Sequence, residues 1–546
     1  MSTRRGRSFI VAVATAVLLA GFGAWVPAAA APSGKALWSP CFRNFGPFEC
    51  ATVGVPLDYD NPSGARISIA MVRLPAADPA LRQGSLFINP GGPGGSGVDF
   101  AIAAAPVLFT QDVRDRFDIV GFDPRGIIRS DPLRCFGTPR QWDPYFTPFT
   151  FPISDAEVDA WVAADRYLDG ACDRRGGAIL DHMSTANVAR DMDRLRQAVG
   201  DAKLTYYGVS YGSMLGQTYA NMFPDNFRAL VIDGVLDPIA WTTGAPGQQD
   251  LPFSTRLRSD QGAQDTLEEF FRLCDEGGEA CPLSGGAGAA ARYAAIADVL
   301  RAGPIVAEDP FTGEIIEYNY SLLIADTLNA MYDSFGWPDF ALLLEYIESQ
   351  ASPAALGRAL AAVRGTSSLA ESSRELARAA GGYVTKRGFP TYPNFIEGFP
   401  AVACADSDNP DDYQAWVDAG ADADEAFGYF GRIWTWVSSI CAEWPGVDDD
   451  RYVGPFDTAT TAPVLVVGAK WDPATRYEGA VIVHDLLPNS ALLTVDSWGH
   501  TSLFASACAD AAIAAYLIAQ STPAPGTTCT QDLVPWVDFG PGGPGG

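Results

Sequence analysis

Basic residues and histidine are scarce in this sequence. Its 546 residues include 37 Lys and Arg against 65 Asp and Glu, for a formal net charge of −28, and only three His. Nucleic acids and anionic membranes attract Lys and Arg, so this charge argues against either as the main partner. At 48% hydrophobic residues the chain can still bury a large core. Its length fits two domains, or one large domain with an insertion.

Among ten cysteines there is no Cys-x-x-Cys pair. With so few His, a Cys/His zinc site is not expected, and we expect neither a metal nor another cofactor. An even number of cysteines in an exported chain indicates disulfides instead. Local spacing suggests the pairs Cys41–Cys50, Cys135–Cys172, Cys274–Cys281, Cys404–Cys441 and Cys508–Cys529.

Three arginines precede an apolar stretch at the N-terminus. Arg4, Arg5 and Arg7 are followed by the apolar run 9–26 and by the small residues 28–31. This order is typical of a secretory signal peptide over 1–31, with a membrane anchor as the alternative. The arginine pair leaves the twin-arginine export route open. We therefore expect a secreted, extracellular protein that is not stably held at a membrane once the leader is removed.

Six short apolar runs, each followed by Gly, Pro or Asp, predict strands. They are residues 85–89, 117–122, 204–207, 229–232, 464–467 and 491–495. Helical patterns separate several of them, which is typical of a parallel sheet covered by helices on both faces. The predicted fold class is therefore α/β, with a mostly parallel sheet.

The composition and the periodicity of the sequence change between about 240 and 455. Strand-like runs stop there, and stretches rich in Ala, Leu, Glu and Arg follow with helical spacing. Examples are 259–274, 289–301 and 353–363. This predicts a large helical cap at 240–455, inserted late in a core that consists of 32–239 and 456–539. The Gly/Pro tail 540–546 is expected to be disordered.

The strongest local motif is Gly208-Val209-Ser210-Tyr211-Gly212. It follows the predicted strand 204–207 and precedes a helical pattern over 213–222. Such a strand–turn–helix holds a serine on a sharp turn, with its hydroxyl exposed for nucleophilic attack. An ordinary crossover is the alternative, because the motif alone can arise by chance in a glycine-rich chain. The flanking strand and helix favour Ser210 as a catalytic nucleophile.

A serine nucleophile needs a base, and the base needs an acid to orient it. His182 precedes Ser210 in the chain, whereas in this architecture the order is serine, acid, histidine. His484 lies in a helical pattern. His500 follows the last predicted strand, so we assign it the base. Asp472 follows a strand and a Gly turn, which favours it as the acid. Asp496 is too close to His500 along the chain to orient the imidazole.

A second signature is the segment 89–97, Asn-Pro-Gly-Gly-Pro-Gly-Gly-Ser-Gly, directly after an early predicted strand. A glycine-rich turn lets backbone N–H groups converge on one point, as a tetrahedral oxyanion requires. The predicted donors are Gly91 or Gly92 together with Tyr211. A phosphate-binding loop is the alternative, but a Walker lysine pattern is absent.

Together, the glycine-rich segment, Phe122-Asp123-Pro124-Arg125-Gly126, the serine motif and the Asp472/His500 ending resemble the α/β-hydrolase exopeptidases. These belong to the proline iminopeptidase group. Because Asn-Pro precedes the glycines, the chain is most similar within that group to the secreted tripeptidyl aminopeptidases of actinobacteria. The resemblance implies an α/β-hydrolase fold and Ser210, Asp472 and His500 as catalytic residues. It also implies an acyl-enzyme, and release of short peptides, tripeptides foremost, from free N-termini. Arg125 is then expected to brace the core.

An exopeptidase must bind a protonated amine, which needs a carboxylate partner in a partly desolvated pocket. Asp406 and Glu397, in the predicted cap, are the candidates, with solvated surface acids as the alternative for either. Asp406 is favoured because a disulfide at Cys404 would hold its backbone. The expected partners are peptides with a free N-terminus, and the expected state is a monomer. A carboxylesterase or lipase with the same triad, or a non-catalytic protein on a degenerate hydrolase fold, remain as alternatives.

Overall fold

The computed structural model describes residues 34–308, 315–350 and 394–543. Its main sheet has ten strands in the order β1-β2-β3-β5-β4-β6-β7-β10-β11-β12. The strand bounds are β1 Ser39–Pro40, β2 Glu49–Pro56, β3 Arg66–Leu74, β4 Gly84–Asn89, β5 Phe117–Phe122, β6 Leu204–Val209, β7 Phe227–Asp233, β10 Val464–Trp471, β11 Ser490–Trp498 and β12 Thr528–Thr530.

From β5 to β12 every neighbouring pair in this order is parallel, whereas β1, β2 and β3 join the other edge in antiparallel pairs. All six strands predicted from the sequence are present, as β4, β5, β6, β7, β10 and β11. Strands β4, β5 and β6 bury every residue. This is expected for parallel strands covered on both faces, and the predicted α/β class is confirmed.

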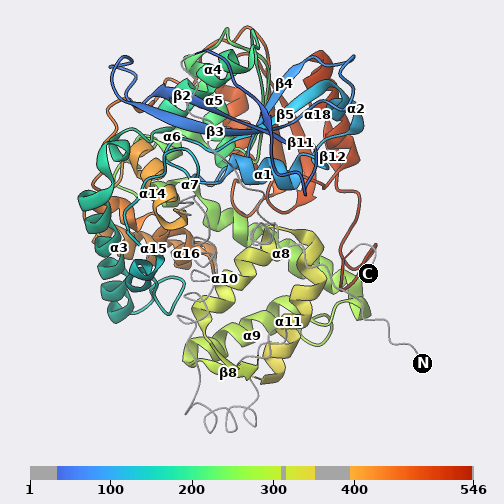
Figure 1. Ribbon diagram of the computed structural model, residues 1–546. Coiled ribbons are helices and arrows are strands. Elements are labelled where there is room, and N and C mark those ends of the chain that lie inside the picture. Colours follow the sequence, from blue (N-terminus) through green and yellow to red (C-terminus); the bar gives the residue numbers. More distant parts are fainter. Residues whose placement is uncertain (1–33, 309–314, 351–393, 544–546) are drawn as a thin grey trace.

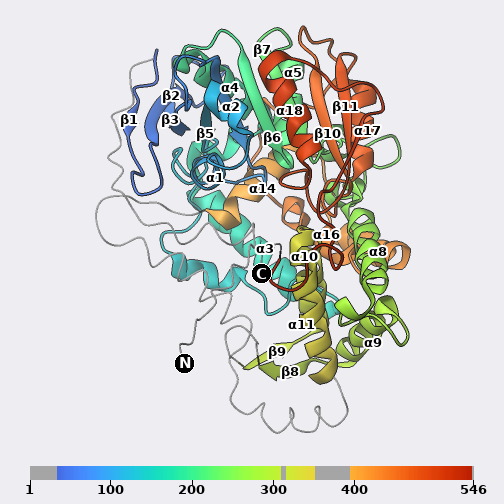
Figure 2. The same ribbon diagram turned by 90° about the vertical axis from the view of Figure 1, so that its right-hand side faces the viewer.

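Helices cover both faces of the sheet (Figures 1 and 2). On one face pack α1 (Gly97–Ala104), α2 (Gln111–Arg116) and α18 (Ala507–Ala519). On the other pack α4 (Thr185–Val199), α5 (Tyr211–Met222) and α17 (Tyr477–Leu486). Two apolar cores, one on each face, therefore hold the carboxyl ends of the parallel strands in place.

A layer of further helices lies below the sheet in both views (Figures 1 and 2). One half of it contains α8 to α11, and the other half contains α3 together with α14 to α16. The bounds are α3 Asp155–Arg175, α6 Pro238–Trp241, α7 Phe253–Leu257, α8 Ser259–Gly277, α9 Ala289–Ala302, α10 Tyr320–Met331, α11 Trp337–Gln350, α14 Phe395–Asp406, α15 Gln414–Phe427 and α16 Gly431–Trp436. Helix α3 belongs to this layer although it precedes β6, because Trp161 and Arg166 bind Ser439 and Glu443.

Of the three helices expected in this region, those at 259–274 and 289–301 are present as α8 and α9. The third, 353–363, lies outside the described residues. The expectation that strands are absent from 240–455 is wrong. A two-stranded antiparallel sheet joins β8 (Ile305–Glu308) to β9 (Ile315–Tyr318). Both strands carry β-branched residues, which favour the extended backbone, but four residues are too few to stand out from the helices around them.

The structure contains all five disulfides in the expected local pairing. Cys404–Cys441 ties α14 to a 3₁₀ helix at Ser439–Ala442, and Cys508–Cys529 ties α18 to β12. Within the described part of the chain, no helix is both long and apolar enough to cross a bilayer. The leader 1–31 and tail residues 544–546 lie outside the described residues.

Candidate active site

Ser210 sits between the end of β6 and the first residue of α5. Its backbone has φ 58° and ψ −128°, a conformation that is costly for a residue with a side chain. Two backbone hydrogen bonds hold it there: Ser210 N donates to Asp233 O at 2.9 Å, and Ser213 N donates to Ser210 O at 2.7 Å. The strand–turn–helix expected around this serine is therefore present, with strain concentrated on Ser210 itself.

Asp472 and His500 form a hydrogen-bonded pair at the carboxyl ends of β10 and β11. The imidazole Nδ1 lies 2.9 Å and 3.0 Å from the two Asp472 carboxylate oxygens. Asp472 is buried and also accepts hydrogen bonds from the backbone N–H groups of Ala474, Thr475 and Thr501. So many donors fix the carboxylate in its ionised form, and it in turn orients the ring of His500.

Charge and burial act in opposite directions on this pair. Burial lowers the pKa of the His500 imidazole, but the adjacent Asp472 carboxylate outweighs it and holds the pKa above its usual value. Burial likewise raises the pKa of Asp472, and the attraction and hydrogen bond of His500 reverse the shift, so the net pKa is lowered. The pair is built to stabilise a positive imidazole, which a general base becomes during catalysis.

The strand order brings the three sequence-predicted residues to one edge, because β6, β7, β10 and β11 are consecutive neighbours. An added methyl at Gly234, directly after β7, would lie 3.5 Å from Asp472 Oδ2, and Asp233 binds Ser210 N. Among the described residues, no hydrogen bond joins the Ser210 hydroxyl to His500. Catalytic hydrogen bonds are often long in unliganded enzymes and shorten once substrate is bound.

The two histidines and the aspartate that were not assigned to catalysis have other partners in the structure. His484 Nδ1, on α17, pairs with Ser490 Oγ, in β11, at 2.8 Å, and the His182 carbonyl accepts a hydrogen bond from Arg125. Asp496 accepts hydrogen bonds from Lys470 and Trp471. None of these four contacts involves Ser210, Asp472 or His500.

The loop that carries His500 is anchored at two further points that sequence reasoning missed. His500 N donates to Tyr332 O at 2.9 Å, and an isolated bridge pairs Asp333 with Gly499. Ser502 donates to the Asp233 carboxylate from its N–H at 3.0 Å and from its hydroxyl at 2.6 Å. Asp233 follows a predicted strand just as Asp472 does, and this shared position was the signal that could have found it.

The glycine-rich loop lies against the serine. An added methyl at Gly91 would be 2.6 Å from Val209 O and 2.8 Å from Tyr211 N, so only glycine permits this approach. Gly91 N donates to Asn89 Oδ1 at 2.9 Å. Its N–H is therefore already in use, which favours Gly92 as the donor from this loop. Tyr211 N begins α5, where an N–H has no partner within its own helix.

Arg125 is fully buried. Its guanidinium binds Asp191 through two hydrogen bonds of 2.8 Å and 2.7 Å and also donates to backbone carbonyls, among them Leu57 O. The contacts are those of a residue that braces the core, as the sequence suggested.

The two candidate carboxylates for the substrate amine are both on α14 and both buried. The Asp406 oxygens accept hydrogen bonds from Thr185 N at 2.8 Å, from the Thr185 hydroxyl and from Trp241 Nε1 at 3.2 Å. Burial raises the pKa of Asp406 to about 7. Glu397 precedes Gly398, whose carbonyl carbon would lie 2.9 Å from a methyl added at Gly94. The backbone of α14 next to Glu397 therefore contacts the glycine-rich loop.

No group of three or more His, Cys, Asp or Glu side chains in the described ranges is arranged to hold a metal ion. The chemistry available at this edge is thus that of a strained serine, an imidazole paired with a buried carboxylate, and converging backbone N–H groups.

Comparison with known proteins matches residues 84–260 to the family described as alpha/beta hydrolase fold, and residues 426–529 to the family described as TAP-like protein. The chain is 31% identical to "Serine protease Hip1" of Mycobacterium tuberculosis, over 90% of either chain. It is 30% identical to "Tripeptidyl aminopeptidase" of Streptomyces coelicolor, over 94% of this chain and 89% of that protein. It is 32% identical to "Carboxylesterase B" of M. tuberculosis, over 88% and 86% respectively.

Proposed function

The chain belongs to the α/β-hydrolase family that includes these peptidases, and on that premise we propose that it is a serine exopeptidase. It removes short peptides, tripeptides foremost, from free N-termini through an acyl-enzyme on Ser210. The observation that carries the proposal is the Asp472–His500 pair, which lies at the same carboxyl edge of the sheet as the strained Ser210. Relatives named as a serine protease and a tripeptidyl aminopeptidase, matched over nearly the whole chain, support peptides as substrates.

In the first half of the reaction, the Ser210 hydroxyl attacks the scissile carbonyl while His500 takes its proton. Asp472 stabilises the imidazolium that forms. The N–H groups of Gly92 and Tyr211 receive the oxyanion of the tetrahedral intermediate. His500 then gives the proton to the leaving nitrogen, which departs as the new N-terminus of the shortened peptide and leaves the acyl group on Ser210.

In the second half, His500 removes a proton from water, and the resulting hydroxide attacks the acyl carbonyl. Collapse of this intermediate returns the proton to Ser210 and releases the short peptide with a free carboxylate. Asp472 is buried and held by three backbone N–H groups, so it can orient His500 in both halves.

Exopeptidase specificity requires a carboxylate for the substrate amine, and of the two candidates we favour Glu397. The backbone of its neighbour Gly398 contacts Gly94 in the loop that receives the oxyanion. Asp406 instead links Thr185 and Trp241, and Thr185 in turn bonds the Tyr211 hydroxyl. We infer that Asp406 holds Tyr211 in place and that Glu397 binds the amine.

A tripeptide chromogenic amide tests the function directly. We expect cleavage of the unblocked substrate and about ten- to a hundredfold lower kcat/KM for its N-acetylated form, because one charge-assisted contact is lost. Glu397→Gln should remove most of this difference, and Asp406→Asn should preserve it. Equal cleavage of blocked and free peptides by the native protein would contradict exopeptidase action.

A second candidate function is supported by the relative named as a carboxylesterase. The same triad would hydrolyse small esters, and an esterase has no use for an amine-binding carboxylate. Hydrolysis of p-nitrophenyl esters without any cleavage of the peptide amide would favour this candidate. Loss of both activities in Ser210→Ala, with an unchanged circular dichroism spectrum, would show that one serine is responsible and would exclude a purely non-catalytic binding protein.

We also propose that the protein is secreted and acts as a monomer on extracellular peptides. Five disulfides support an oxidising compartment. Detection in culture supernatant with an N-terminus near Ala31 would establish both export and the site of leader removal.

A further inference from the structure

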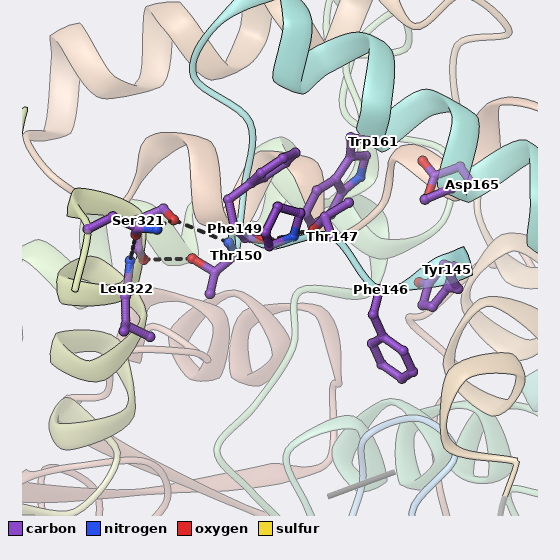
Figure 3. A pocket seen from close by; sticks show the side chains of 12 residues that line it. Tyr145, Phe146, Thr147, Phe149, Thr150, Trp161, Asp165, Ser321 and Leu322 are labelled. Carbon is purple, nitrogen blue, oxygen red and sulfur yellow. Dashed lines mark hydrogen bonds between the residues drawn. The ribbon is translucent and has the colours of Figure 1, made fainter. Parts of the chain in front are cut away.

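A cavity of about 280 Å³ lies apart from the residues assigned to catalysis. It is bounded by the segment 145–150, by α3 and by the start of α10, so it lies between the two halves of the helical layer (Figure 3). Its lining residues include Tyr145, Phe146, Phe149, Trp161, Asp165 and Ser321.

Aromatic rings and one carboxylate dominate this lining. Phe149 and Trp161 stack with centroids 6.1 Å apart, and Tyr145 stands beside Phe146 at 5.9 Å. The carboxylate of Asp165 is fixed by Ser439, whose hydroxyl donates to Asp165 at 2.6 Å and accepts from Trp161 Nε1 at 2.9 Å. Aromatic faces next to a carboxylate favour a cation, because both present negative potential to it.

A second buried carboxylate follows one helical turn later. Asp169 is four residues from Asp165, on the same face of α3. It is 6% exposed, and neither of its oxygens has a hydrogen-bond partner among the described residues. Arg166, between them in sequence, pairs with Glu443 at 2.6 Å instead. Within the described chain, no Lys or Arg forms an ion pair with Asp165 or Asp169.

Among the described residues this pair has no ion-pair partner, and only the charge of Arg166 acts to lower the pKa of Asp169. Burial raises the pKa of both Asp165 and Asp169 to about 8. Burial, together with Asp165, Asp169 and Glu397, also raises the pKa of Tyr145. Without a counter-charge these buried carboxyls are mainly protonated at neutral pH, and a cation that enters beside Asp165 would favour their ionised form.

We propose that this cavity is a subsite for a cationic group of the peptide substrate, with Asp165 as the contacting carboxylate and Asp169 as a second charge behind it. The subsite rests on the proposed exopeptidase function and adds a substrate preference to it.

Helix α10 sets the distance between the cavity and the catalytic base. Its first residues, Ser321 and Leu322, line the cavity, and Tyr332, just after its end, accepts the hydrogen bond of His500 N. Twelve residues of helix span about 18 Å. An extended tripeptide covers only about 10 Å. A cationic group can therefore reach the cavity as the α-amine of a longer acyl group, or as a Lys or Arg side chain near the first residue of a short one.

Two pairs of substrates distinguish these sources. For the side chain, Lys-Ala-Ala is compared with norleucine-Ala-Ala, each as the chromogenic amide with a free N-terminus. For the α-amine, unblocked pentaalanine amide is compared with its N-acetyl form. We expect about a tenfold lower KM for the cationic member of one pair. Asp165→Asn should abolish this preference and Asp169→Asn should reduce it, while Asp159→Asn, an exposed residue of the same helix, should keep it.

Thr147→Lys provides a variant that does not remove a buried group. Thr147 lines the cavity from the loop, so a lysine there places an ammonium next to Asp165 from within the protein. It should remove the preference for cationic substrates and raise the thermal midpoint. A cationic preference that persists in both Asp165→Asn and Thr147→Lys would overturn the proposal, as would its absence from the native protein.

Failure of the subsite and failure of the proposed function give different results. If the native protein cleaves Ala-Ala-Ala amide with no cationic preference in either pair, only the subsite is wrong. If it cleaves no peptide amide, the proposed function is wrong. The subsite is then measured by calorimetry on Ser210→Ala with Lys-Ala-Ala and norleucine-Ala-Ala, where equal affinity would overturn it too.

Discussion

Replacing Gly91 by alanine should disable catalysis while leaving the protein folded. The added methyl would lie 2.6 Å from Val209 O, 2.8 Å from Tyr211 N and 2.9 Å from Ser210 Cβ. A carbon–oxygen contact is normally at least about 3.3 Å, so the loop and the elbow must separate by about 0.7 Å. These atoms belong to the nucleophile, to the residue before it and to an oxyanion donor, and no flexible side chain can yield in their place.

A misplacement of this size in a catalytic site costs on the order of 10²-fold in rate. Loss of one oxyanion donor costs a similar factor, so we expect kcat for the tripeptide amide to fall by about 10²-fold. KM should change less than kcat, because an oxyanion donor acts mainly in the transition state.

Gly200→Ala is the matched control. Gly200 has φ +92°, close to the +84° of Gly91, but a methyl added there meets nothing within 4 Å. Both alanines suffer the left-handed backbone cost of about 1–2 kcal/mol. Thermal midpoints should thus drop in both variants, with activity lost only in Gly91→Ala. A kcat within threefold of the native value in Gly91→Ala, or an equal loss in both variants, would refute the reasoning.

Three further changes test the electrostatics. Because the pKa of His500 is raised and the base must be neutral, kcat/KM should increase with pH through a midpoint above 6.5. Asp472→Asn should move that midpoint downward and reduce kcat by about 10⁴-fold, whereas a native midpoint below 6.5 would contradict the assigned pair. Asp233→Asn removes a charge that raises the pKa of His500 and weakens the anchor of Ser502, so the midpoint should fall with a smaller loss of kcat. No change in the pH profile would leave Asp233 a purely structural role. The raised pKa of Asp169 means that the native state releases its proton later than the unfolded chain, so this group costs stability as pH rises from about 4 to about 8. Asp169→Asn should therefore raise the thermal midpoint more at pH 8.5 than at pH 5.5, and equal shifts at both pH values would argue against a buried charge.

The central sheet could be predicted because its parallel strands are buried on both faces and so form unbroken apolar runs. Strand β6 is an example, with all six residues buried. Strands β2 and β3 did not stand out, although they pair over eight residues. In β2 buried and half-buried residues alternate, so its run is interrupted by residues such as Thr52 and Gly54. The α/β class could still be predicted, because it follows from the inner parallel strands alone.

Ser210, Asp472 and His500 could be selected from the sequence because each follows a strand, and parallel strands end at one edge. The residues that hold them in position could not be selected in this way. Tyr332 holds the His500 backbone through its carbonyl oxygen, which every residue type possesses. Asp165 and Asp169 precede the elbow by more than forty residues, and only folding places α3 opposite α10. The choice between Glu397 and Asp406 likewise depended on hydrogen bonds that cross from α14 to α4 and α6.

The contact of Tyr332 and Asp333 with Gly499 and His500 has a consequence for how substrate enters. The segment that follows α10 is hydrogen-bonded to the catalytic loop itself, by one N–H···O bond and one bridge. If α10 moved away from the sheet, it would pull on the backbone of His500 and displace the imidazole. Substrate entry that keeps the Asp472–His500 pair intact must therefore leave the end of α10 in place.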